Sequence, residues 1–288
     1  MTSFASSPFT MPAALAAADT FLGGTPQWTG DLANVDQVEW LESFRRRAAV
    51  AARVLHDKIQ TNATTDITDH GTFLQKHGWP AKITQGRPNS LYLAAVARFG
   101  GRWLSAGDEL DRGGHRYAHL RQNIAVSSRV GPTQLVGIET EKSNVQFLLR
   151  QALPDEVKTQ HDLRQIALFM QAEWTSSDLE GYTEAGEVEF PMIDLTASDE
   201  AAHMIGIASG DNVIYQAAEQ FTLQMNHLGG LARAAAELAM ARGGPSRRKP
   251  RVVIEGPFVT AVIVEGVHEP VYAAYCDRDS WKVPDLKL

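Results

Sequence analysis

The chain has 288 residues, of which 44% are hydrophobic and 21% are charged, with 23 Gly, 13 Pro and one Cys. These values are typical of a globular protein and exclude a collagen-like fibre, a disordered tail protein and a disulfide-stapled scaffold. The 27 Lys and Arg residues and 34 Asp and Glu residues give a net charge of −7, which argues against a general nucleic-acid binder. Cys276 has no second cysteine with which to form a disulfide.

No stretch approaches the roughly eighteen consecutive apolar residues expected of a membrane-spanning helix. The alanine-rich segment 10–24 is interrupted by Asp19, and no Lys or Arg precedes Arg45. A secretory signal needs a basic leading region and an unbroken apolar one. We therefore expect no membrane partner, and either a cytoplasmic protein or a mature form whose leader has been removed.

The first hundred residues are predicted to hold two helices and one strand. Ala and Leu at helical spacing predict a helix over 11–22. A second amphipathic helix is expected from 34 or 36, where Asn or Asp can cap it, to about 58, with Arg45–Arg47 facing solvent. The pattern over 61–89 is irregular, and the apolar run 91–99 predicts a buried strand.

Runs rich in Val, Ile and other apolar residues predict extended segments along the rest of the chain. They cover 124–128, 134–139, 145–149, 188–195, 221–226, 251–255, 258–265 and 271–276. Helical spacing returns over 156–174, and a short helix is expected over 200–207. The chain is therefore predicted to be of the α+β class, without internal repeats.

The sequence lacks the common phosphate-binding and nucleophile motifs. It contains no Gly-x-Gly-x-x-Gly, no Gly-rich loop ending in Lys-Ser/Thr and no Gly-x-Ser-x-Gly. Ser246 and Lys249 match a Ser-x-x-Lys pair, but prolines bracket the motif in a loop, so we interpret the match as chance. We predict no catalytic residue and no cofactor.

Two polar clusters are weaker candidates. His115 and His119 are four residues apart and could share a helix face as metal ligands, but no Glu lies between them as in zinc-protease helices. We therefore expect no metal site. For Asp66, Asp69 and His70 a capping or turn role is the favoured interpretation.

Five segments in chain order resemble motifs of the serpin family. Phe-Ala-Ser-Ser-Pro-Phe-Thr-Met at 4–11, followed by Leu-Gly-Gly-Thr at 22–25, is similar to Phe-Ser-Pro-x-Ser-Ile and Leu-Gly-x-x-Gly-x-Thr. Residues 91–103, which end in Gly-Gly-Arg-Trp, resemble the strand motif Leu-x-Leu-x-Asn-Ala-x-Tyr-Phe-Lys-Gly-x-Trp. Val-Glu-Phe-Pro at 188–191 and Ile-Gly-Ile at 205–207 resemble Val-x-Leu-Pro-Lys-Phe and Leu-Gly-Ile.

The last two resemblances lie towards the C-terminus. Residues 225–236, Met-Asn-His-Leu-Gly-Gly-Leu-Ala-Arg-Ala-Ala-Ala, resemble the reactive-loop hinge Val-Asn-Glu-Glu-Gly-Thr-Glu-Ala-Ala-Ala. Pro-Phe at 257–258 and Pro-Val-Tyr at 270–272 are similar to the closing strand pair. The resemblance implies a compact serpin-like fold: a single domain over 1–288, with three β-sheets, surrounding helices and an exposed reactive-centre-type loop over 229–251.

The function that the resemblance implies is that of a serine-type endopeptidase inhibitor. In this family a protease cleaves the loop, and the freed segment inserts as a new strand into the central sheet. Insertion relieves stored strain and removes the acylated protease before water can release it. The partner implied is a serine protease of the trypsin-like or subtilisin-like kind.

The resemblance also assigns roles within the loop. The hinge residues are Gly229, Gly230, Ala232, Ala234, Ala235 and Ala236. Counting from the hinge places the scissile bond at Arg242-Gly243, which suits a trypsin-like protease, with Met240 and Ala241 as alternates for a subtilisin-like or elastase-like one. Small or apolar residues at every second position from Gly230 to Met240 fit a strand with one buried face.

Two features of the loop remain open to another interpretation. Segment 231–242 suits a permanent surface helix as well as an insertable strand, because strong helix formers lie between two glycine pairs. A basic patch could steer acidic partners or could simply be solvated, and it comprises Arg247, Arg248, Lys249 and Arg251.

The sheet-opening region that the resemblance implies comprises Thr10, Ala95, Trp103, Glu219 and His227. Ala95 stands where the family pattern has Asn, and Glu219 stands where it has His. His227 and Leu228 stand where it has an acidic pair. The chain is also shorter than a typical serpin, and we expect the usual first helix to be absent.

These differences leave a second function open. A non-inhibitory serpin fold could bind a small molecule, or act as a biosynthetic enzyme such as a cyclase, in a pocket left by the shortened N-terminal half. The candidate pocket residues are Trp103, His115, His119, Glu219 and His227.

Overall fold

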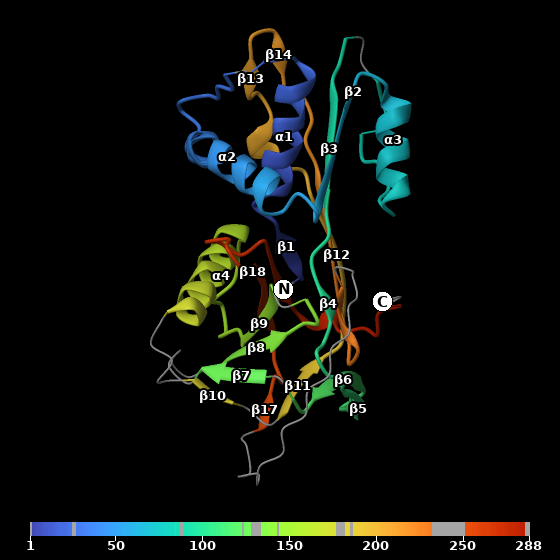
Figure 1. Ribbon diagram of the computed structural model, residues 1–288, viewed down its shortest axis with the longest axis vertical. Helices are drawn as coiled ribbons and strands as arrows, with labels where there is room; N and C mark the ends of the chain where they lie inside the picture. The colour runs from blue at the N-terminus through green and yellow to red at the C-terminus, as the bar shows by residue number, and fades with distance from the viewer. Residues whose placement is uncertain are drawn as a thin grey trace. The chain divides into compact units, whose positions relative to one another are not determined.

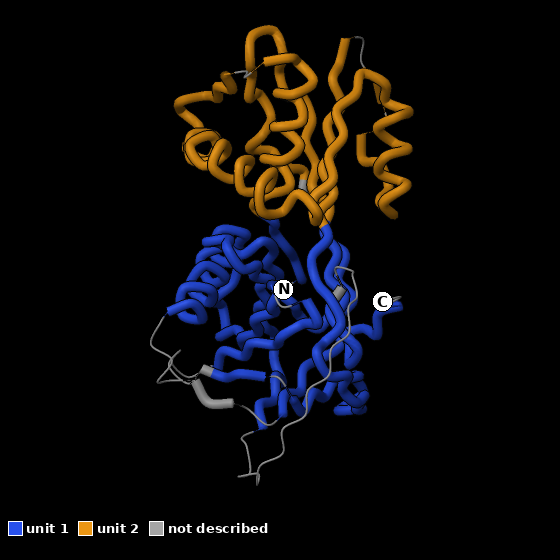
Figure 2. Tube along the Cα trace, in the orientation of Figure 1, with its two compact units in different colours: residues 1–7, 98–197, 221–288 blue, residues 8–97, 198–220 orange. Residues whose placement is uncertain are grey.

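The computed structural model describes residues 2–24, 27–83, 85–86, 89–122, 124–127, 134–142, 144–176, 182–184, 187–231 and 251–285. Helices and several β-sheets make up these residues (Figure 1). The chain divides into two compact units, of which unit 1 comprises 1–7, 98–197 and 221–288, and unit 2 comprises 8–97 and 198–220 (Figure 2). The single domain expected over 1–288 stays a prediction.

Unit 1 is built on a seven-stranded antiparallel sheet. Its strand order is β1 (Phe4–Ser6), β19 (Tyr272–Cys276), β18 (Phe258–Val264), β9 (Val145–Gln151), β8 (Leu135–Glu139), β7 (Ile124–Ser127) and β10 (Tyr182–Glu184). β1 pairs with β19, so the first strand of the chain lies beside the last. β18 is buried at every position, as expected of a central strand rich in Val and Ile.

Helix α4 (Gln160–Thr175) packs against β18, β19, β9 and β1 of this sheet. A capping box begins the helix, because Thr159 accepts a hydrogen bond from the Asp162 N–H and the Asp162 carboxylate accepts one from the Thr159 N–H. Leu163 and Met170 place the apolar stripe of the helix in one core with the sheet.

Two four-stranded sheets lie mainly in unit 1. One has the order β17 (Arg251–Val253), β11 (Glu187–Pro191), β6 (His115–Leu120) and β5 (Asp108–Arg112), with β17 parallel to β11 and the other neighbours antiparallel. The other has the order β12 (Ile193–Asp199), β15 (Glu219–Met225), β16 (Gly229–Leu231) and β4 (Gly101–Arg102). A short 3-10 turn, η3 (Arg278–Ser280), precedes Trp281.

Unit 2 contains three α-helices and two small sheets among its described residues. They are α1 (Thr10–Phe21), α2 (Val35–Arg53), α3 (Ile67–Lys76), the antiparallel pair β2 (Ile59–Thr64) and β3 (Tyr92–Ala97), and the hairpin β13 (Ala208–Ser209) and β14 (Asn212–Val213). Both α1 and α3 pack against β2 and β3 (Figure 1). A separate apolar cluster forms around the 3-10 turn η2 (Ala202–Met204).

The structure confirms the α+β class and most of the expected elements. The helix expected over 11–22 is α1, and α2 begins where Asn34 Oδ1 accepts from the Gln37 N–H, although it ends at Arg53. The expectation that all of Arg45–Arg47 face solvent is wrong at Arg47, which is 3% exposed. The helix expected over 200–207 shortens to η2. Within the described part of the chain, no helix has the length and apolar character that crossing a bilayer requires.

The expectation of an irregular stretch over 61–89 is wrong, because this stretch holds most of β2 and all of α3. Asp66 is the N-cap of α3, with Oδ1 accepting from the Thr68 N–H at 2.7 Å, which confirms the capping interpretation for this residue, whereas Asp69 and His70 lie within the helix. The buried residue of α3 is the polar His70, and the partly buried Ile67, Phe73 and Leu74 make its apolar face too short to be recognised in the sequence. Charged β5 was missed because an edge strand carries few apolar residues.

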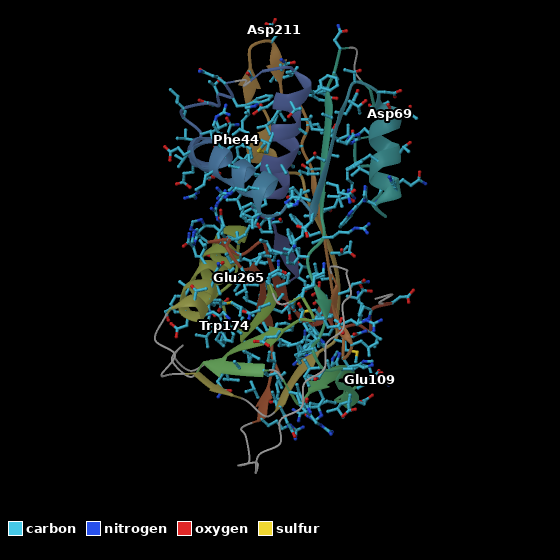
Figure 3. All side chains as sticks on the ribbon, in the orientation of Figure 1. Phe44, Asp69, Glu109, Trp174, Asp211 and Glu265 are labelled. Atoms are coloured by element: carbon cyan, nitrogen blue, oxygen red, sulfur yellow. The ribbon has the colours of Figure 1, made fainter. Side chains whose placement is uncertain are left out.

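Gly137→Ala is expected to lower the free energy of unfolding by about 1–3 kcal/mol. Trp174, at the end of α4 (labelled in Figure 3), packs over Gly137, and a Cβ there would lie 2.0 Å from the indole ring. Urea unfolding measures the change. Gly71→Ala in α3 is the matched control, because a Cβ there meets nothing within 4 Å, and it should raise stability by about 0.5–1 kcal/mol. Equal effects of the two substitutions would contradict the packing of Trp174.

His70 is expected to make unit 2 sensitive to acid. The residue is 2% exposed, its ring packs on Tyr92 at 5.8 Å, and burial lowers the pKa of the imidazole below 6.5. The unfolded chain therefore binds this proton at a higher pH than the folded chain, so stability is lost as the pH falls below about 6.5. When the pH is lowered from 7.5 to 5.5, the free energy of unfolding should fall by about 1 kcal/mol less in His70→Gln than in the wild type. His161→Gln, at an exposed position of α4, should behave like the wild type, and the same loss in both variants would contradict the role of His70.

Candidate functional site

The described part of the candidate hinge begins in the turn between β15 and β16. Asn226 is buried, and its Oδ1 accepts hydrogen bonds from the N–H groups of Leu228 at 2.8 Å and Gly229 at 3.2 Å. The Asn226 N–H donates to Gly229 O at 2.9 Å. An Asn side chain that bonds the backbone just ahead of it stabilises a tight reversal of the chain. β16 therefore runs back along β15, with Gly230 opposite Met225.

The three-residue strand β16 lies between β15 and β4. Gly229 and Gly230 pair with Arg102 and Gly101 of β4, antiparallel. Directly after β4, the Trp103 N–H donates to Leu228 O at 3.2 Å, and the Gly107 N–H donates to His227 O at 2.7 Å. The chain that leads into residues 232–250 therefore starts as a strand with hydrogen-bonded neighbours on both sides.

The indole of Trp103 packs beneath this strand. The residue is buried, and its Nε1 donates to Asn226 O at 2.8 Å. Phe147 and Phe190 meet the indole edge-on, with ring centroids 5.2 Å and 6.3 Å away. A Cβ at Gly230 would lie 2.9 Å from the Trp103 ring and 2.8 Å from the Phe147 ring. Glycine is therefore required at Gly230 by close packing.

Two of the sheet-opening residues meet in unit 2. Thr10 begins α1, and its Oγ1 donates to Glu219 Oε1 at 2.8 Å. Glu219 begins β15, so a carboxylate accepts a hydrogen bond where the family pattern has an imidazole. Ala95 lies on β3 opposite Thr61. In unit 1, Trp103 lies against the turn that contains His227.

Most of the expected reactive loop lies outside the described residues. This applies to Ala232, Ala234, Ala235, Ala236, Met240, Ala241, Arg242, Gly243 and the Ser246–Lys249 motif. The choice between an insertable strand and a helix over 231–242 therefore stays open. Of the hinge residues, the structure describes Gly229 and Gly230.

The expected basic patch is reduced by one charge. Arg251 donates a hydrogen bond to Glu189, whose side chain is fully buried, so the Arg251 charge is balanced within the sheet. Arg247, Arg248 and Lys249 lie outside the described residues.

His115 and His119 lie on strand β6, so the interpretation of a shared helix face is wrong. Residues four apart also share one face of a strand, which is why the spacing did not distinguish the two cases. The His115 ring packs edge-on against Trp281 at 5.2 Å, and His119 Nε2 lies 3.1 Å from Glu187 Oε2. No group of three or more His, Cys, Asp or Glu residues among those described could hold a metal ion.

Three residues of this region were missed in the sequence, namely Asn226, Phe147 and Glu189. Asn226 had a usable signal, because an Asn three residues before a Gly pair is typical of a turn. Phe147 and Glu189 had none, since they reach their partners from strands that are distant in sequence.

The sequence and the fold give different results when compared with known proteins. No protein-family model matches the chain, and no curated protein matches it in sequence. Serpin48, described as a highly specific serpin of the insect Tenebrio molitor, has a similar structure at 12% identity and a TM-score of 0.58, with 99% of this chain and 93% of that chain covered.

Two further structures are similar over nearly the whole chain. The mouse protein-Z-dependent protease inhibitor is 12% identical with a TM-score of 0.54, and 96% of this chain and 90% of that chain are covered. Human thyroxine-binding globulin, complexed with its hormone, is 12% identical with a TM-score of 0.53, and 95% and 91% are covered. The fold expected from the five motifs is therefore confirmed.

Gly230→Ala is expected to loosen β16. The added methyl group would press on two buried aromatic rings, which costs about 1–3 kcal/mol, and amide hydrogen exchange of residues 229–231 should rise accordingly. Phe147→Leu in the same chain leaves room beside position 230 and should restore part of the protection. Wild-type exchange in the Gly230→Ala variant would contradict the close packing of this strand on Trp103 and Phe147.

Proposed function

We propose that this chain, which has the serpin fold, is a serine-type endopeptidase inhibitor that acts through loop cleavage and strand insertion. The observation that carries the proposal is the position of β16. This strand already occupies a place between β15 and β4, and it is the part of the described chain that leads directly into residues 232–250. Insertion would lengthen β16, which is already paired, rather than form a separate strand. The loop-closure entropy of the first strand pairing is therefore already lost before cleavage.

The register of β15 and β16 supports an inserted strand with one buried face. Gly230 opposes Met225, so continued pairing would set Ala232 opposite Leu223 and Ala234 opposite Phe221. Met225, Leu223 and Phe221 are all buried. The small residues of the loop would then share the face on which Gly230 meets the aromatic rings.

The opposite face of the extended strand would carry the charge of Arg233. By the same register, Arg233 would stand opposite Thr222, which is exposed on β15. An arginine there keeps its charge in water, so this position of the loop matches the exposed face of β15.

The chemistry of trapping follows that of a protease with a substrate. The protease serine attacks the carbonyl carbon of Arg242, a proton passes to the nitrogen of Gly243, and the Arg242–Gly243 bond breaks to leave an ester with the protease. Insertion of the freed strand would then draw the ester away from the protease oxyanion site before water attacks it. Arg242 suits a protease whose specificity pocket is acidic.

The likeness to the mouse protein-Z-dependent protease inhibitor supports inhibition, whereas the likeness to a globulin complexed with thyroxine supports the small-molecule alternative. The residues suggested for the small-molecule pocket favour inhibition instead, because the side chains of four of them contact different partners. Trp103 packs on Phe147, His115 packs on Trp281, and His119 lies beside Glu187. Glu219 bonds to Thr10 in unit 2.

Incubation with a trypsin-like and a subtilisin-like protease tests the proposal. We expect a complex that survives denaturing gel electrophoresis, and a higher melting temperature for the loop-cleaved chain than for the intact chain. No complex with either protease, together with an unchanged melting temperature after cleavage, would refute inhibition by insertion. In that event, a ligand-dependent rise in melting temperature in a small-molecule screen would favour the alternative.

A matched pair of variants tests the register. Ala234→Glu would bury an unpaired carboxylate opposite Phe221, so it should turn the protein from an inhibitor into a substrate and lower the yield of complex at least about tenfold. Arg233→Glu places the same side chain on the exposed face and should keep the wild-type yield. Equal yields from the two variants would contradict the proposed pairing with β15.

A further inference from the structure

A buried carboxylate lies beside β17, the strand that follows residues 232–250. Glu189 is on β11, in the sheet that contains β17, and its side chain is 0% exposed. A carboxylate without water is costly to the fold unless cations and hydrogen-bond donors surround it. The contacts of Glu189 therefore indicate which part of the structure its charge stabilises.

Two arginines from different strands hold this carboxylate. Arg251 of β17 donates a hydrogen bond to Glu189 Oε1, and Arg112 Nη2 of β5 lies 3.4 Å from Glu189 Oε2. His119 of β6 lies directly opposite Glu189 across the sheet, with its Nε2 3.9 Å from Oε1. Arg112 also donates to Glu255, just beyond β17, at 2.6 Å. One buried charge thus connects all four strands of the sheet.

The strand that Glu189 contacts is short and has one paired neighbour among the described strands. β17 has three residues, and among the described strands it lies at the edge of the sheet and pairs with β11 alone. Beyond it, the Ile254 N–H donates to Glu189 O at 2.9 Å. A strand of this length with one neighbour makes few ladder hydrogen bonds, and edge strands of this kind open readily. Val252 and Ile254 also bury apolar side chains, and the ionic contact at Arg251, the first residue of β17, adds to what keeps the strand in place.

We infer that Glu189 is a positioning residue that fixes β17, and with it the chain immediately after residues 232–250. The inference deepens the proposed function and rests on it in one respect, that these residues are the protease-cleaved loop. A loop held at β16 and at β17 presents its scissile bond within a limited region, which favours productive capture by the protease. With β17 released, the fixed point moves to β18, and the bond is presented over a wider region.

The test compares two glutamates of the same strand. Glu187 lies on the same face of β11 as Glu189 and directly opposite Arg251, but its side chain is 40% exposed against 0% for Glu189. In the free protein, Glu189→Gln should raise amide hydrogen exchange at Val252–Ile254 about tenfold and leave residues 229–231 unchanged. Glu187→Gln should leave both segments as in the wild type. Equal exchange at Val252–Ile254 in the two variants would overturn the inference. It would also be overturned if Glu189→Gln raised exchange at residues 229–231 as much as at Val252–Ile254.

Arg251→Gln provides a second route to the same test. The Arg251 side chain is half-exposed, and its replacement leaves the buried Glu189 carboxylate in place. It should reproduce the exchange pattern, and the Glu189→Gln/Arg251→Gln double variant should add little to either single change. Full additivity would mean that the two residues act separately and would overturn the inference. This route also applies if the Glu189→Gln chain does not fold.

A second readout measures capture of the protease. The rate constant for complex formation should fall about tenfold in Glu189→Gln and stay at the wild-type value in Glu187→Gln. An unchanged rate in Glu189→Gln would overturn the positioning role even if β17 has loosened. If the wild type forms no complex, the proposed function fails, and the exchange experiment on the free protein still decides whether Glu189 fixes β17.

Discussion

The packing of the Trp103 indole is the contact on which the rest of unit 1 depends. Trp103 follows β4, its ring meets Phe147 of the seven-stranded sheet, and it also meets Phe190 of the sheet that contains β17. Its backbone pairs with Thr140, whose hydroxyl donates to Val145 O at the start of β9. One side chain therefore contacts all three large sheets of the unit, and the position of β16 follows from it, because the indole also bonds the Asn226 carbonyl.

The two ends of residues 232–250 are held by different kinds of interaction. At β16 the chain is fixed by backbone pairing and by aromatic rings that exclude any side chain at Gly230. At β17 charge is added to strand pairing and to the buried side chains of Val252 and Ile254, through a buried carboxylate and half-exposed arginines. Apolar packing depends weakly on ionic strength, whereas contacts that involve partly exposed ions are screened by salt. The two ends can therefore respond differently to the same change in the surroundings.

The sequence was most informative where one physical pattern dominates. Apolar periodicity was enough to predict α1, α2 and the late strands, and five short motifs indicated the fold although overall identity to known structures is only 12%. The pattern failed at α3, whose buried residue is His70, and at β5, whose residues are mostly charged. The apolar face of α3 is short and has a polar residue at its buried position, and β5 has almost no apolar residue, so a local apolar pattern was not enough to find either element.

The candidate site was only partly predictable for a related reason. Gly229, Gly230 and Trp103 were recognisable from motifs, and the structure gives the physical need for Gly230 in the ring contacts that surround it. The Thr10–Glu219 hydrogen bond and the Arg251–Glu189 pair join residues that are far apart in the chain. Complementary charge or hydrogen bonding at such distances becomes visible only when the fold brings the partners together.

The pairing of β1 with β19 also constrains the order in which the protein can fold. Phe4 pairs with Tyr275, a partner that lies far along the chain. Because a chain is synthesised from its N-terminal end, β1 stays unpaired until β19 has been made, while unit 2, whose longest stretch is 8–97, has most of its residues before β19. Contacts of such long sequence separation slow folding, because the chain must close a large loop before the sheet gains its edge. Pairing of β1 with β19, and with it completion of the seven-stranded sheet, is therefore a late step of folding.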